Sequence, residues 1–136
     1  MAQLDIESRL EAVAPIVLSI FRIVVGFLFA CHGTSKLFGW PVALEGGAPP
    51  FGQWPLWYAG VIELLVGILV ATGLVTRIAA LIGSGQMAFA YFTVHQPVAP
   101  LPIANGGEAA VLYCFAFFLL VFTGGGIIAL DSLRQR

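Results

Sequence analysis

Charged residues are scarce in this sequence. Six lysines and arginines and seven aspartates and glutamates make up 10% of the 136 residues, for a formal net charge of -1. A soluble domain has about a quarter of its residues charged, so the composition argues against a water-soluble fold. A basic face is also missing, which excludes an electrostatic case for binding nucleic acid.

Cysteine and histidine are rare as well, with two residues of each. Two cysteines cannot form a disulfide framework. Helical phase turns Cys31 about 180° and Cys114 about 120° from the polar faces of their predicted helices, so we interpret both as small hydrophobic residues. Two histidines without a ligand-spacing motif predict no metal or haem site.

The start of the chain lacks the basic segment and short apolar stretch of a cleaved signal peptide. Four charged residues instead precede the first apolar run: Asp5, Glu7, Arg9 and Glu11. We therefore expect the first apolar run to stay in the mature protein. The segment 4–13 mixes apolar and charged residues and has two interpretations, a short helix on the membrane surface or a frayed terminus.

Hydrophobic residues, by contrast, make up 60% of the chain. They form four runs near the roughly 20 residues that a helix needs to cross a bilayer, at about 15–36, 56–76, 78–95 and 108–130. Helices satisfy their own backbone polar groups in lipid. The sequence thus predicts an all-α integral membrane four-helix bundle, a single transmembrane domain spanning residues 1–136 with the lipid bilayer as its surroundings.

The arginines predict the orientation of this bundle. Four crossings place both termini on one side, and that side holds four arginines, whereas the other side has only Lys36. The four are Arg9, Arg77, Arg134 and Arg136. Because cytoplasmic loops are enriched in Lys and Arg, we expect a multi-pass protein of the inner (plasma) membrane with both termini in the cytoplasm.

Arg22 and Glu63 each lie inside a predicted span. Ionisable residues at this depth face the bundle interior and mark functional sites or pairs. One interpretation is a buried Arg22–Glu63 ion pair that fixes helix register. The other is a pocket in the outer half of the bundle, where Glu63 faces partners on neighbouring helices. These candidate partners are His32, Lys36, Tyr91 and His95.

Small residues share the helix faces that carry these polar groups. At about 100° per residue, Gly26 and Gly33 fall on the Arg22 stripe, and Gly60 and Gly67 on the Glu63 stripe. Small residues permit close helix packing in membranes, so we expect these stripes to form the bundle interior. A third stripe runs along the span 78–95: Ala80, Ser84, Ala88, Tyr91 and His95.

Three further positions have specific expectations. Gln86 lies about 160° from the third stripe, so we expect it to meet another protomer. Asn105 followed by Glu108 resembles a capping box, and Glu108 would also place a carboxylate at the mouth of the pocket. The run Gly124-Gly125-Gly126 predicts a local break in the last helix. A nucleotide-binding glycine loop would follow a β-strand, and no strand is predicted before this run.

The ordered motifs are similar to those of the DoxX family of small four-helix bacterial membrane proteins. The resemblance covers about residues 22–131 and rests on Arg22, His32-Gly33-x-x-Lys36-Leu37, Gly60-x-x-Glu63-x-x-x-Gly67, Gly73-x-x-Thr76-Arg77, Asn105-Gly106-Gly107-Glu108 and Leu130-Asp131. Many relatives have Gly-Pro-Gly where this chain has three glycines at 124–126. The resemblance implies redox work at the membrane, because relatives include a subunit of an archaeal thiosulfate:quinone oxidoreductase and partners of oxidative-stress enzymes.

The resulting hypothesis is a redox-associated subunit with a pocket for a quinone or similar small molecule. Glu63 and His32 would act as catalytic acid or base, and Lys36 would stabilise negative charge. The remaining predicted binding residues are Arg22, Tyr91, His95 and Glu108. Electrons would come from a partner in a membrane protein complex, and the small apolar chain is expected to form such a complex or a homo-oligomer. The alternative is a noncatalytic scaffold or accessory subunit.

Overall fold

Long helices make up most of the molecule. The computed structural model describes residues 2–134. Its elements are α1 (Ala2–Phe38), α2 (Leu56–Thr72), α3 (Thr76–Ala90), the π-helical turn η1 (Tyr91–His95), α4 (Pro102–Asn105), α5 (Glu108–Thr123) and α6 (Leu130–Leu133). No strand occurs in this range, so the all-helical prediction is confirmed. Because η1 directly follows α3, residues 76–95 form one continuous helical segment.

Among residues 2–134, one helix alone has the length and composition of a membrane span. It covers Asp5–Phe38 and contains an 18-residue stretch with a mean hydropathy of 2.4. Helices α2 and α5 are apolar but contain 17 and 16 residues, fewer than the roughly 20 that a straight crossing needs. Both end earlier than the predicted spans because Gly73 and Gly124 take positive φ values of 73° and 77°, which stop an α-helix.

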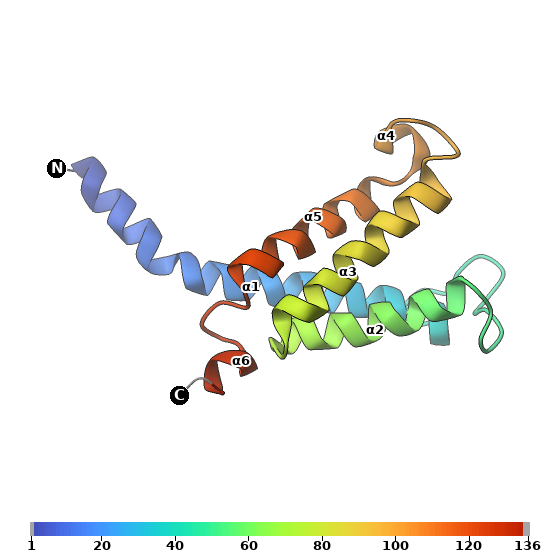
Figure 1. Cartoon of the computed structure of the whole chain (residues 1–136), viewed down its shortest axis with the longest axis horizontal. Coiled ribbons are helices and arrows are strands. Elements are labelled where there is room, and N and C mark those ends of the chain that lie inside the picture. Colours follow the sequence, from blue (N-terminus) through green and yellow to red (C-terminus); the bar gives the residue numbers. More distant parts are fainter. Residues whose placement is uncertain (1, 135–136) are drawn as a thin grey trace.

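Helix α1 begins far earlier than the predicted span. Residues 2–38 form one helix with Pro15 inside it, so the first segment is neither a separate short helix nor frayed. Figure 1 shows its N-terminal stretch leaving the rest of the molecule at an angle. Proline removes a backbone donor and bends a helix. The hydroxyl of Ser19 donates to the carbonyl oxygen of Pro15 at 2.8 Å.

Helices α1 and α2 pack directly on each other through glycines. A Cβ on Gly67 would lie 2.7 Å from the Cα of Ala30, and one on Gly33 would lie 2.8 Å from the carbonyl oxygen of Gly60. No real side chain fits at such distances, so the two backbones approach as small residues at a membrane helix interface allow. The predicted stripes on these two helices are therefore confirmed as their contact.

Helices α3 and α5 form the second pair. The hydroxyl of Ser84 donates to the carbonyl oxygen of Cys114 at 2.9 Å, and a Cβ on Gly83 would meet the ring of Phe117 at 3.0 Å. The two pairs join where Phe29 of α1 lies edge-on to Phe117, with ring centroids 4.7 Å apart. Phe29 and Phe117 are both buried, so they form the centre of the core.

The two ends of the molecule differ. The N-terminal stretch of α1, the turn between α2 and α3, and α6 lie at one end, which we call the terminal end (Figure 1). The long loops 39–55 and 96–107 lie at the opposite end, which we call the loop end. Both described ends of the chain thus lie on the same side of the bundle.

Side chains from distant segments close the helix ends at the terminal end. The carboxylate of Asp131 accepts from the backbone N–H of Val75 at 2.7 Å and of Thr76 at 2.8 Å, at the start of α3. Nη1 of Arg77 donates to the carbonyl oxygens of Val121 and Phe122, at 2.6 and 2.7 Å. Unsatisfied groups at helix termini need such partners.

The Asp131 carboxylate is charged in this setting. Burial alone would raise its pKa, but the backbone N–H donors of Thr76 and Val75, helped by the nearby Arg134, hold the pKa of Asp131 below its ordinary value. A negative charge at the N-terminus of a helix also complements the helix dipole. The Thr76-Arg77 and Leu130-Asp131 motifs therefore have structural roles in joining α3, α5 and α6.

Candidate functional site

Arg22 is an anchor for backbone carbonyls at the terminal end. Its side chain is 1% exposed. Nε donates to the carbonyl oxygen of Gly125 at 2.8 Å, and Nη1 donates to those of Val70 and Ala71 at 2.7 and 2.8 Å. Nη2 donates to the carbonyl oxygen of Ile128. One guanidinium thus ties α1 to the C-terminal end of α2 and to the segment after α5.

The predicted Arg22–Glu63 ion pair is therefore wrong, and so is the prediction that Arg22 lines the pocket. The last carbonyls of a helix lack intrahelical partners and carry partial negative charge. Two oxygens at the end of α2 and two oxygens of the segment after α5 satisfy the arginine without a carboxylate. A sequence shows where carboxylates lie but not where the chain presents free carbonyls, so this partner set was not predictable.

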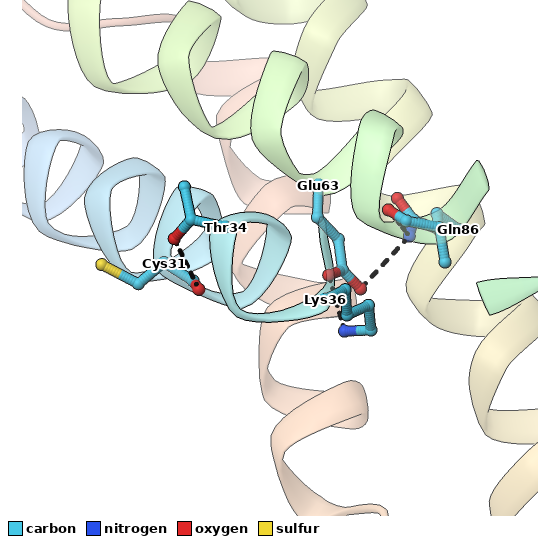
Figure 2. Close-up of polar contacts among 6 residues, drawn as sticks. Cys31, Thr34, Lys36, Glu63 and Gln86 are labelled. Carbon is cyan, nitrogen blue, oxygen red and sulfur yellow. Dashed lines mark hydrogen bonds and ion pairs between the residues drawn. The ribbon is translucent and has the colours of Figure 1, made fainter. Parts of the chain in front are cut away.

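Glu63 pairs with Lys36 at the loop end. Nζ of Lys36 lies 2.6 Å from Oε2 of Glu63, with side-chain exposures of 17% and 4%. Nε2 of Gln86 donates to Oε1 of Glu63 at 3.3 Å and to the carbonyl oxygen of Ala59 at 3.2 Å. In Figure 2 these three side chains, from α1, α2 and α3, point toward one another. We call them the polar triplet. The predicted pocket alternative for Glu63 is thereby supported in geometry.

Gln86 was expected to face another protomer, and this prediction is wrong. Helix α3 has neighbours on two sides: Ser84 contacts α5, whereas Gln86 reaches α2. A helix that packs between two neighbours has two interior faces. A residue that lies opposite one interior face can therefore face the other neighbour instead of the outside. Oε1 of Gln86 is buried and has no hydrogen-bond partner among residues 2–134.

A cavity of about 350 Å³ lies beside the polar triplet, between α1, α2, α3, η1 and α5. We call it the loop-end cavity. Apolar residues line most of it, including Phe29, Leu56, Met87, Phe89 and Ala110. The polar side chains in its lining are His32, Lys36, Glu63, Gln86, Thr93, His95 and Tyr113. An apolar cavity with a few convergent polar groups is the usual form of a small-molecule site.

His32 and His95 both line this cavity, as expected. His32 is exposed at the rim and lies edge-on to the ring of Tyr113, with centroids 5.7 Å apart. Nδ1 of His95 lies 3.1 Å from the carbonyl oxygen of Asn105. A carbonyl oxygen can only accept, so Nδ1 donates and Nε2 of His95 is left as an acceptor in the neutral ring. Sequence reasoning did not find Tyr113.

Tyr91 and Glu108 do not line the cavity, contrary to prediction. The hydroxyl of Tyr91 accepts from Nδ2 of Asn105 at 3.4 Å, and Glu108 is exposed at the start of α5. The rings of Tyr91 and His95 stack on one face of η1, with centroids 6.4 Å apart. The hydroxyl of Tyr91 meets Asn105 in the turn before α5, and only His95 of the two lines the cavity.

The predicted capping box is also wrong. Helix α5 follows Gly107 without a side-chain cap. Asn105 instead shapes the turn before the helix, because its Oδ1 accepts from the N–H of Gly107 and its Nδ2 donates to the carbonyl oxygen of Ala99, both at 2.8 Å. A Cβ on Gly107 would collide with Asn105 and His95. The Asn-Gly-Gly sequence thus serves a tight turn.

The cysteines lie outside the loop-end cavity lining. Figure 2 shows the sulfur of Cys31 pointing away from the polar triplet. Sγ of Cys114 lies 3.5 Å from the hydroxyl of Ser84, inside the α3–α5 contact. Within residues 2–134, no three His, Cys, Asp or Glu side chains come together as metal ligands would.

Comparisons with known proteins agree with the motif pattern. The DoxX family model matches residues 17–96, a stretch that includes the polar triplet. An uncharacterized protein of Haemophilus influenzae is 44% identical over 128 residues, covering 92% of this chain and 96% of that protein. "Putative oxidoreductase CatD" of Bacillus subtilis is 31% identical over 117 residues, 82% of each chain. No solved structure matches.

Proposed function

Because this chain belongs to the DoxX family of membrane proteins, we propose that its loop-end cavity binds a quinone or a similar small molecule for a membrane redox system. The observation that carries this proposal is the polar triplet on the wall of a mainly apolar cavity. A quinone likewise combines polar and apolar parts, because its polar oxygens are carried by an apolar ring. The relative named as an oxidoreductase supports redox work.

The groups around the cavity suit proton-coupled reduction of a quinone. The reaction takes two electrons, supplied by a partner redox protein, and two protons. Nζ of Lys36 keeps N–H donors beyond the one used by Glu63, and these would stabilise the oxygen as negative charge develops. Glu63, a carboxylate in its pair with Lys36, would take up a proton and pass it to the quinone oxygen, and His32 at the exposed rim would exchange protons with the surroundings.

Glu63→Gln tests this site. The amide is nearly isosteric with the carboxyl group, its oxygen can still accept from Lys36, and the Lys36 side chain is 17% exposed and open to water, so the fold should persist. Loss of the proton-carrying group should weaken quinone binding or lower turnover in the assembled complex by about 100-fold or more. Binding of short-chain benzoquinone and naphthoquinone analogues to purified protein, with turnover measured in native membranes, checks both effects.

Cys31→Ala and Cys114→Ala are matched controls, because both residues lie outside the cavity lining. Their binding and turnover should equal those of the unaltered protein. If the glutamine variant keeps full binding and activity, the quinone site is falsified. Loss of activity in the cysteine variants would point instead to a dithiol mechanism.

A noncatalytic accessory subunit is the second candidate. Lys36 and Glu63 compensate each other's charge, and Gln86 donates to Glu63, as a group that only locks three helices would. Purification from native membranes, followed by analysis of bound quinones and co-purifying chains, separates the two functions. Co-purified redox subunits without bound quinone would favour the accessory role.

We also propose that α1, α2, the segment 76–95 and α5 each cross the inner membrane, with the terminal end in the cytoplasm. Arg9, Arg77 and Arg134 belong to the terminal end, and Lys36 is near the loop end. In a Cys31→Ala/Cys114→Ala background, a membrane-impermeant thiol reagent added outside intact cells should label Ala48→Cys and not Gln135→Cys. The reverse labelling pattern would overturn this orientation.

A further inference from the structure

A second and larger cavity opens at the terminal end, away from the polar triplet. Its volume is about 950 Å³, and it lies between the first half of α1, the start of α3 and the segment from Thr123 to Arg134. Pro15 of α1 lies in its wall. We call it the terminal-end cavity. Nothing in the proposed quinone chemistry uses it.

Arg77 presents unused donors to this cavity. Its Nη1 holds the two carbonyl oxygens at the end of α5, whereas its Nε and Nη2 have no hydrogen-bond partner among residues 2–134. The guanidinium lies against Gly124, where a Cβ would be 3.3 Å from Nη2. The capping bonds thus fix the guanidinium in place, and one edge of it stays available to a ligand.

The charges around the terminal-end cavity favour an anion. Two arginines and one aspartate line it: Arg77, Arg134 and Asp131. The Asp131 carboxylate is already matched by two N–H groups at the start of α3, so its charge is largely compensated. Arg22 lies directly behind the wall, with its Cδ 3.4 Å from where a Cβ of Gly125 would be. The surplus charge is therefore positive.

The remaining lining divides into polar and apolar parts. Ala14, Leu18 and Ile78 supply an apolar wall formed by α1 and α3. Thr76 is 1% exposed, and its side chain lies beside the Asp131 carboxylate, whose pKa it helps to lower. A ligand that suits this cavity has an anionic head and an apolar tail.

We propose that the terminal-end cavity binds an anionic phospholipid, with the lipid phosphate on Arg77 and Arg134 and an acyl chain along Leu18 and Ile78. Guanidinium groups bind phosphate oxygens through paired N–H donors. The cavity lies at the helix ends, the level at which lipid headgroups meet a membrane protein. Basic pockets between helices at this level are suited to lipid headgroups.

Lipid titration of the purified full-length chain tests the assignment. Native mass spectrometry of delipidated protein in detergent should show one tightly bound dioleoylphosphatidylglycerol. Dioleoylphosphatidylcholine, which carries the phosphate without net negative charge, should bind more weakly. Inorganic phosphate should not compete at comparable concentration, because it lacks the acyl chains that the apolar wall would contact.

Arg134→Gln removes a lining charge but no hydrogen bond, since the side chain forms none within residues 2–134 and only its charge acts on the nearby Asp131. Affinity for phosphatidylglycerol should fall about fivefold, the effect of roughly one charge at a membrane surface. Arg134→Glu should lower the affinity for phosphatidylglycerol about 25-fold. Arg9→Gln is the matched control, because Arg9 pairs with Asp5 outside the cavity, and its affinity should not change.

Three results would overturn the proposal. Equal binding of the two phospholipids would remove the anionic preference. Competition by inorganic phosphate at equal concentration would leave an anion site without a lipid. Unchanged affinity in both Arg134 variants would place the bound lipid elsewhere on the protein. Each of these readouts is independent of quinone binding, so this proposal and the proposed function can fail separately.

Discussion

Replacing Arg22 with methionine should destabilise the protein by about 3–5 kcal/mol. The substitution removes the partner of four carbonyl oxygens from two segments, the end of α2 and the segment after α5, and each buried polar group left unsatisfied costs about 1–3 kcal/mol before relaxation. The side chain is 1% exposed, so water does not replace it readily. Unfolding of the purified variant in detergent measures the loss.

Arg22→Lys is the informative control. Lysine keeps the charge, but a single ammonium group cannot donate along the fixed directions of a guanidinium fork. We expect this variant to recover only part of the lost stability. The losses for Arg22→Met and Glu63→Gln should add within about 0.5 kcal/mol in the double variant, because the two sites share no partner. If Arg22→Met lowered the free energy of unfolding by less than about 1 kcal/mol, the anchoring role of Arg22 would be contradicted.

Breaking the Lys36–Glu63 pair should have the second large effect. Lys36→Met leaves the Glu63 carboxylate, with a side chain 4% exposed, without its counterion. Removing one partner of a buried pair costs about 3–5 kcal/mol. We expect the lower end of this range, because the Lys36 side chain is 17% exposed and water can partly take its place. Thermal unfolding in detergent at neutral pH checks the value.

The double variant Lys36→Met/Glu63→Gln separates lost charge compensation from lost packing. It removes both charges and keeps similar volumes, so it should be more stable than Lys36→Met alone. Acidic pH should also reduce the loss of stability caused by Lys36→Met, because protonation neutralises the Glu63 carboxylate that has lost its counterion. A double variant no more stable than the single one would show that the pair contributes through packing rather than charge.

Features governed by local sequence were predictable from the chain. Glycine and apolar spacing identified the faces on which α1 and α2 pack, and Gly124-Gly125-Gly126 identified the end of α5. The helix bounds were less accurate. Asp131 closes the start of α3 from more than 50 residues away. A cap supplied by a distant segment leaves no short-range pattern, unlike the capping box that Asn105 and Glu108 resemble.

The site was predictable only in part for the same reason. The position of each residue along its predicted helix correctly placed Glu63, Lys36 and the two histidines at the same end of the molecule. Choosing partners among groups of similar depth requires the positions of the neighbouring helices. Gln86 was misplaced because α3 contacts helices on two sides, and Tyr91 because its hydroxyl meets Asn105 in the turn before α5. Arg22 was misassigned because its partners are carbonyls.

The glycine contact between α1 and α2 also has a mechanical consequence. Backbones this close cannot slide past one another without collision, so the first two helices behave as one stiff lever, and α3 with α5 forms another. Arg22 joins the levers at the terminal end, through its bonds from α1 to the carbonyl oxygens of Gly125 and Ile128 after α5, whereas the loop-end cavity lies between their opposite tips. A small rotation about that joint would widen or close the cavity and leave the interior of each lever unchanged.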